Sequence, residues 1–117
     1  MFQSFEDLEV WKRSCSLAVD IYRMLRDCKD FGMRDPMQRA AVSIASNIAE
    51  GSERSPKEFA HFLNVARGSA AELRTQAYII AAKIGLLNGE DMRSVVNETK
   101  EISRVLYGLS KSLKTEP

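Results

Sequence analysis

The chain has 117 residues, of which 44% are hydrophobic and 28% charged. A chain of this size supports one hydrophobic core, so residues 1–117 are expected to form a single globular domain. No stretch approaches the roughly 20 consecutive apolar residues that a membrane-spanning helix needs. Lys and Arg total 17 against 16 Asp and Glu. The net charge of +1 therefore supplies no long-range field towards nucleic acid or anionic lipid, and any such attraction must come from local patterning.

The N-terminus and the cysteines indicate a cytoplasmic protein. The chain opens with an acidic stretch ending in Glu6-Asp7, where a secretory leader would be basic and followed by a long apolar run. Cys15 and Cys28 fall on one expected helix, about 20 Å apart at 1.5 Å per residue. That separation exceeds the span of a disulfide, so both thiols are expected to be free, as in a reducing compartment.

Histidine is too scarce for the common catalytic and metal sites. His61 is the only one, and Glu58 precedes it with the Glu-x-x-His spacing of di-iron carboxylate bundles. Such a bundle needs two of these motifs and two further carboxylates, so we expect no metal site. No base is placed against a nucleophile, and no glycine-rich phosphate loop occurs. We therefore expect no catalytic residue, no cofactor and no small-molecule substrate.

Capping residues mark four helix starts. In each, a capping side chain stands three residues before an acid or amide, which gives unpaired backbone N–H groups an acceptor. The pairs are Ser4 with Asp7, Asp35-Pro36 with Gln38, Ser55-Pro56 with Glu58, and Asn88 with Asp91. Gly51 and Gly85 are expected to end helices in the left-handed conformation.

Hydrophobic periodicity agrees with these starts. Apolar residues recur at steps of three and four in all four segments, which is typical of helices packed in a bundle, and no segment alternates as a strand would. The predicted core stripe of the first segment is Leu8, Trp11, Cys15, Ala18, Tyr22 and Leu25, and the second segment is expected to span residues 36–50. The fold class is therefore all-α, an antiparallel up-down-up-down four-helix bundle.

The first helix carries a second apolar stripe, about 100° around from the first. Because a four-helix core does not need both, we expect this stripe to be covered by other copies of the chain in a homo-oligomer. The alternative is that the bundle itself absorbs a broad apolar face. The predicted interface residues are Val10, Leu17, Ile21 and Met24.

A polar stripe on the alanine-rich second helix is expected to face a neighbouring helix. Unpaired buried polar groups cost about 1 to 3 kcal/mol, so partners are expected on the third helix. We interpret the set as a structural polar seam that fixes helix register, with a ligand-binding or catalytic role as the alternative. Its members are Arg39, Ser43, Asn47, Glu50, Arg67 and Glu72. Gly68, inside the third helix, is expected to allow close approach of the second helix.

The fourth helix carries a basic stripe with one aromatic and no acid. Rows of cations bind phosphate backbones, and an aromatic among them can stack on an unpaired base. The alternative is a solvated face whose cations pair with Glu98 and Glu101. The candidate nucleic-acid-binding residues are Arg93, Lys100, Arg104, Tyr107, Lys111 and Lys114.

Three blocks of sequence carry a family resemblance over nearly the whole chain. The segment from Gln38 to Gly51, QRAAVSIASNIAEG, resembles the signature of the bacterial four-helix-bundle family named for proteins encoded in intervening sequences of 23S ribosomal RNA genes. FEDLEVW from Phe5, EFAHFL from Glu58 and ARGSAAEL from Ala66 are similar to its other blocks, in the same order.

The resemblance implies an antiparallel four-helix bundle that assembles as a ring-like homo-oligomer, a homopentamer. It also implies similarity to the accessory variability determinant of diversity-generating retroelements, a pentamer that associates with a reverse transcriptase and with nucleic acid. Those accessory proteins are basic, and the net charge of +1 departs from that pattern. Arg39, Asn47, Glu50 and Gly51 match the signature, which assigns them no established chemistry, so we interpret them as structural.

The leading hypothesis is a non-enzymatic, homo-oligomeric scaffold or adaptor that contacts RNA or a nucleic-acid-handling enzyme such as a reverse transcriptase. The alternative is a purely structural protein–protein interaction module without nucleic-acid binding. An enzyme would need a pocket that gathers His61, Glu58 and a third titratable group.

Overall fold

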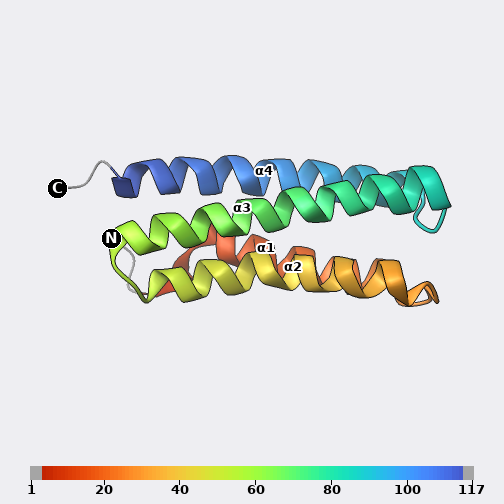
Figure 1. The fold of residues 1–117 in the computed structure, drawn as a ribbon, viewed down its shortest axis with the longest axis horizontal. Helices are drawn as coiled ribbons and strands as arrows, with labels where there is room; N and C mark the ends of the chain where they lie inside the picture. The colour runs from red at the N-terminus through yellow and green to blue at the C-terminus, as the bar shows by residue number, and fades with distance from the viewer. Residues whose placement is uncertain (1–3, 115–117) are drawn as a thin grey trace.

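The computed structural model describes residues 4–114 except for the side chains of residues 82–84 and 114, and its regular structure is helical (Figure 1). Successive long helices reverse direction and pack side by side in a body of 49 × 20 × 18 Å. The predicted all-α up-down-up-down bundle is thereby confirmed. In chain order the elements are η1 (Phe5–Asp7), α1 (Glu9–Met24), α2 (Phe31–Ser52), α3 (Pro56–Tyr78), the π-helical η2 (Ile79–Ile84) and α4 (Gly89–Lys114).

Two of the predicted helix starts are confirmed atom by atom. The Ser55 hydroxyl accepts from the Glu58 backbone N–H at 3.3 Å, and the Asn88 side chain accepts from that of Asp91 at 2.7 Å. Each cap satisfies a backbone donor that the first helical turn leaves unpaired. Gly85 ends η2 with φ of +76°, the left-handed conformation expected of it.

The other two starts differ from the prediction. Ser4 caps the short η1 rather than α1, and α1 begins at Glu9 without a side-chain cap. The second helix begins five residues early, at Phe31, where Asp30 accepts from the Met33 N–H at 3.2 Å. Pro36 therefore lies inside α2. It removes the hydrogen bond to the carbonyl of Gly32, which is exposed, so water can replace the missing donor.

The two apolar faces of α1 are exchanged relative to the prediction. Val10, Leu17 and Ile21 are at most 4% exposed and lie in the core of the protomer, and Met24 packs against that core. The predicted interface residues are thus core residues, which corrects that assignment. Ser14 interrupts their stripe in the sequence, but its buried hydroxyl donates to the Val10 carbonyl at 2.7 Å. Of the predicted core stripe, Leu25 is fully buried as expected, whereas Tyr22 is exposed and the other members are half-buried at the edge of the core.

The close approach of α2 and α3 occurs at Gly51 and not, as expected, at Gly68. Gly51 does not end a helix: it is buried, and a Cβ there would lie 2.5 Å from the Cβ of Phe62 in α3. It is the residue that lets α2 and α3 approach closely. Gly68, for which that role was predicted, is exposed with no atom within 4 Å of a Cβ position.

We predict that Gly51→Ala lowers the free energy of unfolding by about 1–3 kcal/mol, because the added methyl overpacks the α2–α3 contact. Alanine is the better helix former by about 1 kcal/mol, so the same substitution would raise the stability of the protein at a helical glycine with free space around it. Gly108→Ala is the matched control: Gly108 is exposed in α4 with nothing within 4 Å, and stability should rise by about 0.5–1 kcal/mol. Urea unfolding followed by circular dichroism measures both, and a Gly51→Ala protein as stable as the parent would contradict the close contact.

Candidate functional site

The outer surface between α1 and α2 is an apolar groove. It consists of two open hollows, of about 690 and 380 Å³, that share Ala18 and Val42. Val19, Tyr22 and Val42 are 43–50% exposed and line the same hollow, so their exposed apolar surface is contiguous. We call this surface the α1–α2 groove and define it by Trp11, Cys15, Ala18, Val19 and Tyr22 of α1 and Val42 and Ala45 of α2.

One end of the α1–α2 groove is cationic. Arg23, Arg26 and Arg34 line the larger hollow. Arg34 pairs with Asp35 at 3.1 Å and lies 4.4 Å from the centre of the Phe31 ring, whereas Arg23 and Arg26 form no ion pair with a described residue. In the smaller hollow, burial raises the pKa of the Cys15 thiol, which disfavours the reactive thiolate.

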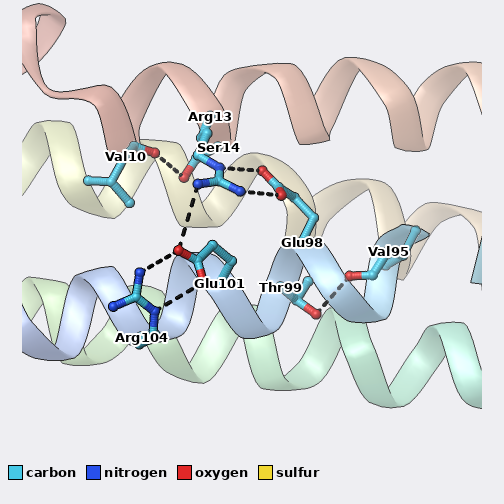
Figure 2. A network of polar contacts seen from close by, with 8 residues as sticks. All are labelled: Val10, Arg13, Ser14, Val95, Glu98, Thr99, Glu101 and Arg104. Atoms are coloured by element: carbon cyan, nitrogen blue, oxygen red, sulfur yellow. Dashed lines mark hydrogen bonds and ion pairs between the residues drawn. The ribbon is translucent and has the colours of Figure 1, made fainter. Parts of the chain in front are cut away.

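An ion-pair network joins α1 to α4 (Figure 2). The guanidinium of Arg13 donates to both carboxylate oxygens of Glu98 at 2.8 Å, and lies 3.9 Å from Glu101. Glu101 also accepts from Arg104 at 3.0 Å. The hydrogen bond to Glu98 raises the pKa of Arg13, and the hydrogen bond from Arg104 lowers the pKa of Glu101. Both pKa shifts favour the charged forms of Arg13 and Glu101.

The predicted basic stripe lies on the solvent side of α4. Arg93, Lys100, Arg104, Tyr107 and Lys111 are exposed, and the side chain of Lys114 lies outside the described residues. Arg104 is neutralised by Glu101, as the solvated-face alternative expects. Arg93, Lys100 and Lys111 form no ion pair with a described residue, so part of the stripe keeps uncompensated charge.

The structure adds an arginine from α3 to this stripe. The guanidinium carbon of Arg67 lies 4.8 Å from the centre of the Tyr107 ring, and the Lys111 ammonium lies 5.4 Å from it. Arg67 also donates to the Asn64 side chain at 3.3 Å, while its Nε is buried without a hydrogen-bond partner. From its spacing alone, Arg67 was expected in the polar seam. Its position beside Tyr107 depends on how α3 and α4 are aligned, which spacing along one helix does not reveal.

The polar seam is smaller than predicted. The hydroxyls of Ser43 and Ser69 lie 2.9 Å apart across α2 and α3, and the Asn47 amide donates to the Ser43 carbonyl at 2.8 Å. These three residues form the observed seam. The other predicted members lie elsewhere: Arg39 and Glu72 are exposed, Glu50 pairs with Arg54 at 3.1 Å, and Arg67 lies against Tyr107.

The Glu58-x-x-His61 motif faces solvent at the start of α3. Glu58 accepts from the Ser55 hydroxyl at 2.9 Å and lies 3.7 Å from Arg54, and His61 packs edge-on against Phe62. Among the described residues, no three His, Cys, Asp or Glu side chains come together as metal ligands would. No helix in the same part of the chain combines the length and apolarity that crossing a bilayer requires.

These features define a four-helix bundle whose distinctive surfaces are an apolar groove and a row of cations. The chain belongs to the 23S rRNA-intervening sequence protein family, whose model matches residues 6–108. It is similar to the crystal structure of a protein of unknown function from the S23 ribosomal protein family of Bacteroides thetaiotaomicron, with 28% identity and a TM-score of 0.80. The match covers 87% of this chain and 98% of the other. No curated protein matches the chain.

Proposed function

We propose that this protein is a non-enzymatic helical-bundle scaffold that assembles with copies of itself through the α1–α2 groove. The observation that carries the proposal is the exposed apolar surface of the groove, where Val19, Tyr22 and Val42 remain 43–50% exposed in the single chain. Contiguous apolar surface of this kind marks interfaces in water-soluble proteins. This proposal keeps the self-association predicted from the sequence and moves its contact residues to the other apolar face of α1.

A second copy of the chain suits this groove because α3 presents a matching outer face. Val65, Gly68, Glu72 and Thr75 of α3 and Ile79 at the start of η2 follow one another at steps of three and four, and all five are exposed. Val65 and Ile79 supply apolar contacts, and Gly68 permits close approach. Glu72 is a carboxylate for the cationic end of the groove. We call this set the outer face of α3.

The family resemblance implies a ring of five copies, and such a ring requires a contact between two different surfaces of the chain. A two-fold contact pairs a surface with itself and cannot link five subunits in a closed ring. A ring needs a head-to-tail contact, in which the α1–α2 groove of each protomer receives another surface of the next. The outer face of α3 is the partner surface that we propose.

We predict that Val42→Glu converts the assembly to monomers at tens of micromolar protein. Val42 lines both hollows, and a glutamate there would place a charged side chain in the apolar part of the proposed contact, at a desolvation cost that the monomer does not pay. Leu86→Glu, at an exposed apolar position in the connection before α4, is the matched control and should leave the assembly unchanged. Sedimentation equilibrium measures both. A parent protein that sediments as a monomer at this concentration would refute the proposal.

We further predict that Gly68→Cys forms disulfides with the native Cys15 of neighbouring copies in a Cys28→Ser background. Mild oxidation should produce a ladder of cross-linked species that ends at the closed ring, visible on non-reducing gels. Gly108→Cys is the matched control, since Gly108 is also an exposed helical glycine with open space around it. Equal cross-linking of the Gly68→Cys and Gly108→Cys variants would reject the outer face of α3 as the partner surface. A ladder that stops at dimers would indicate two-fold pairing.

Contact of this scaffold with RNA is a second candidate function. It is favoured by the uncompensated cations of α4 and by the exposed Tyr107 among them, because cation rows bind phosphates and aromatic rings stack on bases. Repetition around a ring would multiply the number of such contacts. A reverse-transcriptase-like enzyme would then meet the scaffold through shared RNA or directly.

Replacing Lys100, Arg104 and Lys111 together by Glu is predicted to abolish retention of labelled RNA at low salt. The three changes convert a phosphate-attracting row into a repelling one. Filter binding at several salt concentrations measures the effect, with sedimentation as a check that assembly persists. Unchanged retention by the triple variant would reject the stripe as an RNA contact.

A further inference from the structure

We propose that the surface between α3 and α4 binds single-stranded nucleic acid, with Tyr107 and Tyr78 as platforms on which unpaired bases stack. The inference rests on the RNA contact proposed above and deepens it, since it names the strandedness of the ligand and adds residues of α3. We call this surface the α3–α4 track. It consists of Arg67, Arg74 and Tyr78 of α3 and Lys100, Tyr107 and Lys111 of α4.

The contact between Arg67 and Tyr107 sets the register of the track. The guanidinium carbon of Arg67 lies 4.8 Å from the centre of the Tyr107 ring, and α3 and α4 run antiparallel. Seven residues after Arg67 in α3 therefore lie beside seven residues before Tyr107 in α4, which places Arg74 beside Lys100. Tyr78 follows Arg74 by four residues and lies on the same face. The alignment of α3 and α4 therefore places the cationic and aromatic side chains of both helices in one row along the surface between them.

Tyr107 has the environment of a stacking platform. It is 48% exposed, although cations lie near its ring from both helices: Arg67 from α3 and Lys111 one turn along α4. These cations attract phosphates, and the side chain of Tyr107 keeps exposed surface beside them, on which we propose that a base stacks. The neighbouring Gly108 is exposed with nothing within 4 Å, so no side chain obstructs approach from that side.

The ends of the track are spaced for several consecutive nucleotides. Tyr78 is 44% exposed and lies eleven residues from Arg67, about 16 Å along the helix axis. Arg74 and Lys100 lie between the two tyrosines. A single strand can place bases on both rings while its phosphates follow the cations, whereas a duplex keeps its bases stacked inside and offers no free face to either ring.

The acidic residues near the track are engaged away from it. Glu98 and Glu101 lie on the α1 side of α4, where Arg13 and Arg104 bind them. Glu72 lies on the outer face of α3 and contacts Gln76 at 3.4 Å. The cations of the track are therefore not neutralised by these carboxylates.

The test compares labelled U12 RNA, the matching dT12 and a 12-base-pair RNA duplex by fluorescence anisotropy at low and rising salt. The parent protein should bind U12 more tightly than the duplex. Tyr107→Leu should weaken U12 binding roughly 5- to 100-fold while leaving the salt dependence unchanged, because stacking releases no counterions. Tyr107→Phe keeps the ring and should stay within about 2-fold. Arg67→Gln should instead reduce the salt dependence.

Phe31→Leu is the matched control, because Phe31 is 53% exposed and lies beside an arginine, Arg34, but outside the track. It should leave U12 binding unchanged. Equal binding of U12 and duplex, or parent-like affinity of Tyr107→Leu, would overturn the inference. So would a change of oligomeric state in Tyr107→Leu by sedimentation, since the ring would then serve a protein contact.

The outcomes also separate this inference from the RNA contact on which it rests. If the parent protein binds no RNA at low salt, the RNA contact fails and the track fails with it. If RNA binds and the triple Glu variant loses it while Tyr107→Leu does not, only the track is rejected. If dT12 binds as tightly as U12, the track recognises single strands through shared base and phosphate chemistry rather than through the 2′-hydroxyl.

Discussion

The rotation of α1 about its own axis decides which surface of this protein is left for partners. The helix has two apolar faces, and only the one with Val10, Leu17 and Ile21 enters the core. Arg13 binds Glu98 of α4 through two hydrogen bonds of 2.8 Å, which a rotation of 100° would break. Bidentate pairing of this kind adds geometric specificity to its modest energy. Once the rotation is set, Trp11, Cys15 and Ala18 must lie in the α1–α2 groove.

Local signals in the sequence predicted much of the fold, whereas contacts between helices decided the rest. The caps at Ser55 and Asn88 act within one turn, so the sequence alone reveals them. The burial of Ser14 depends on a hydrogen bond to its own helix, which lets a polar residue lie in the core face of α1. Sequence patterning favours the uninterrupted stripe instead, and for that reason it selected the wrong face.

The difference between signals local to one helix and contacts between helices also explains which parts of the candidate surfaces could be predicted from the sequence. The basic stripe of α4 lies on one helix, so its spacing was visible in the sequence. Arg67, Arg74 and Tyr78 join it only through the antiparallel register of α3 and α4, which no single-helix pattern contains. Spacing also assigned too many residues to the polar seam, because it does not distinguish a polar face that meets another helix, as at Ser43, from one that meets water, as at Arg39.

Near-neutral net charge and nucleic-acid binding are compatible in this architecture because opposite charges are segregated. The carboxylates of Glu98 and Glu101 are bound on the α1 side of α4, and the cations of the α3–α4 track remain on the other. The outer face of α3 lies about 100° around that helix from Arg67 and Arg74, as helical periodicity requires. The assembly that we propose, through that face and the α1–α2 groove, would therefore leave the track open to solvent. In such a ring each protomer would contribute one track, and the cationic surface would grow with the number of protomers.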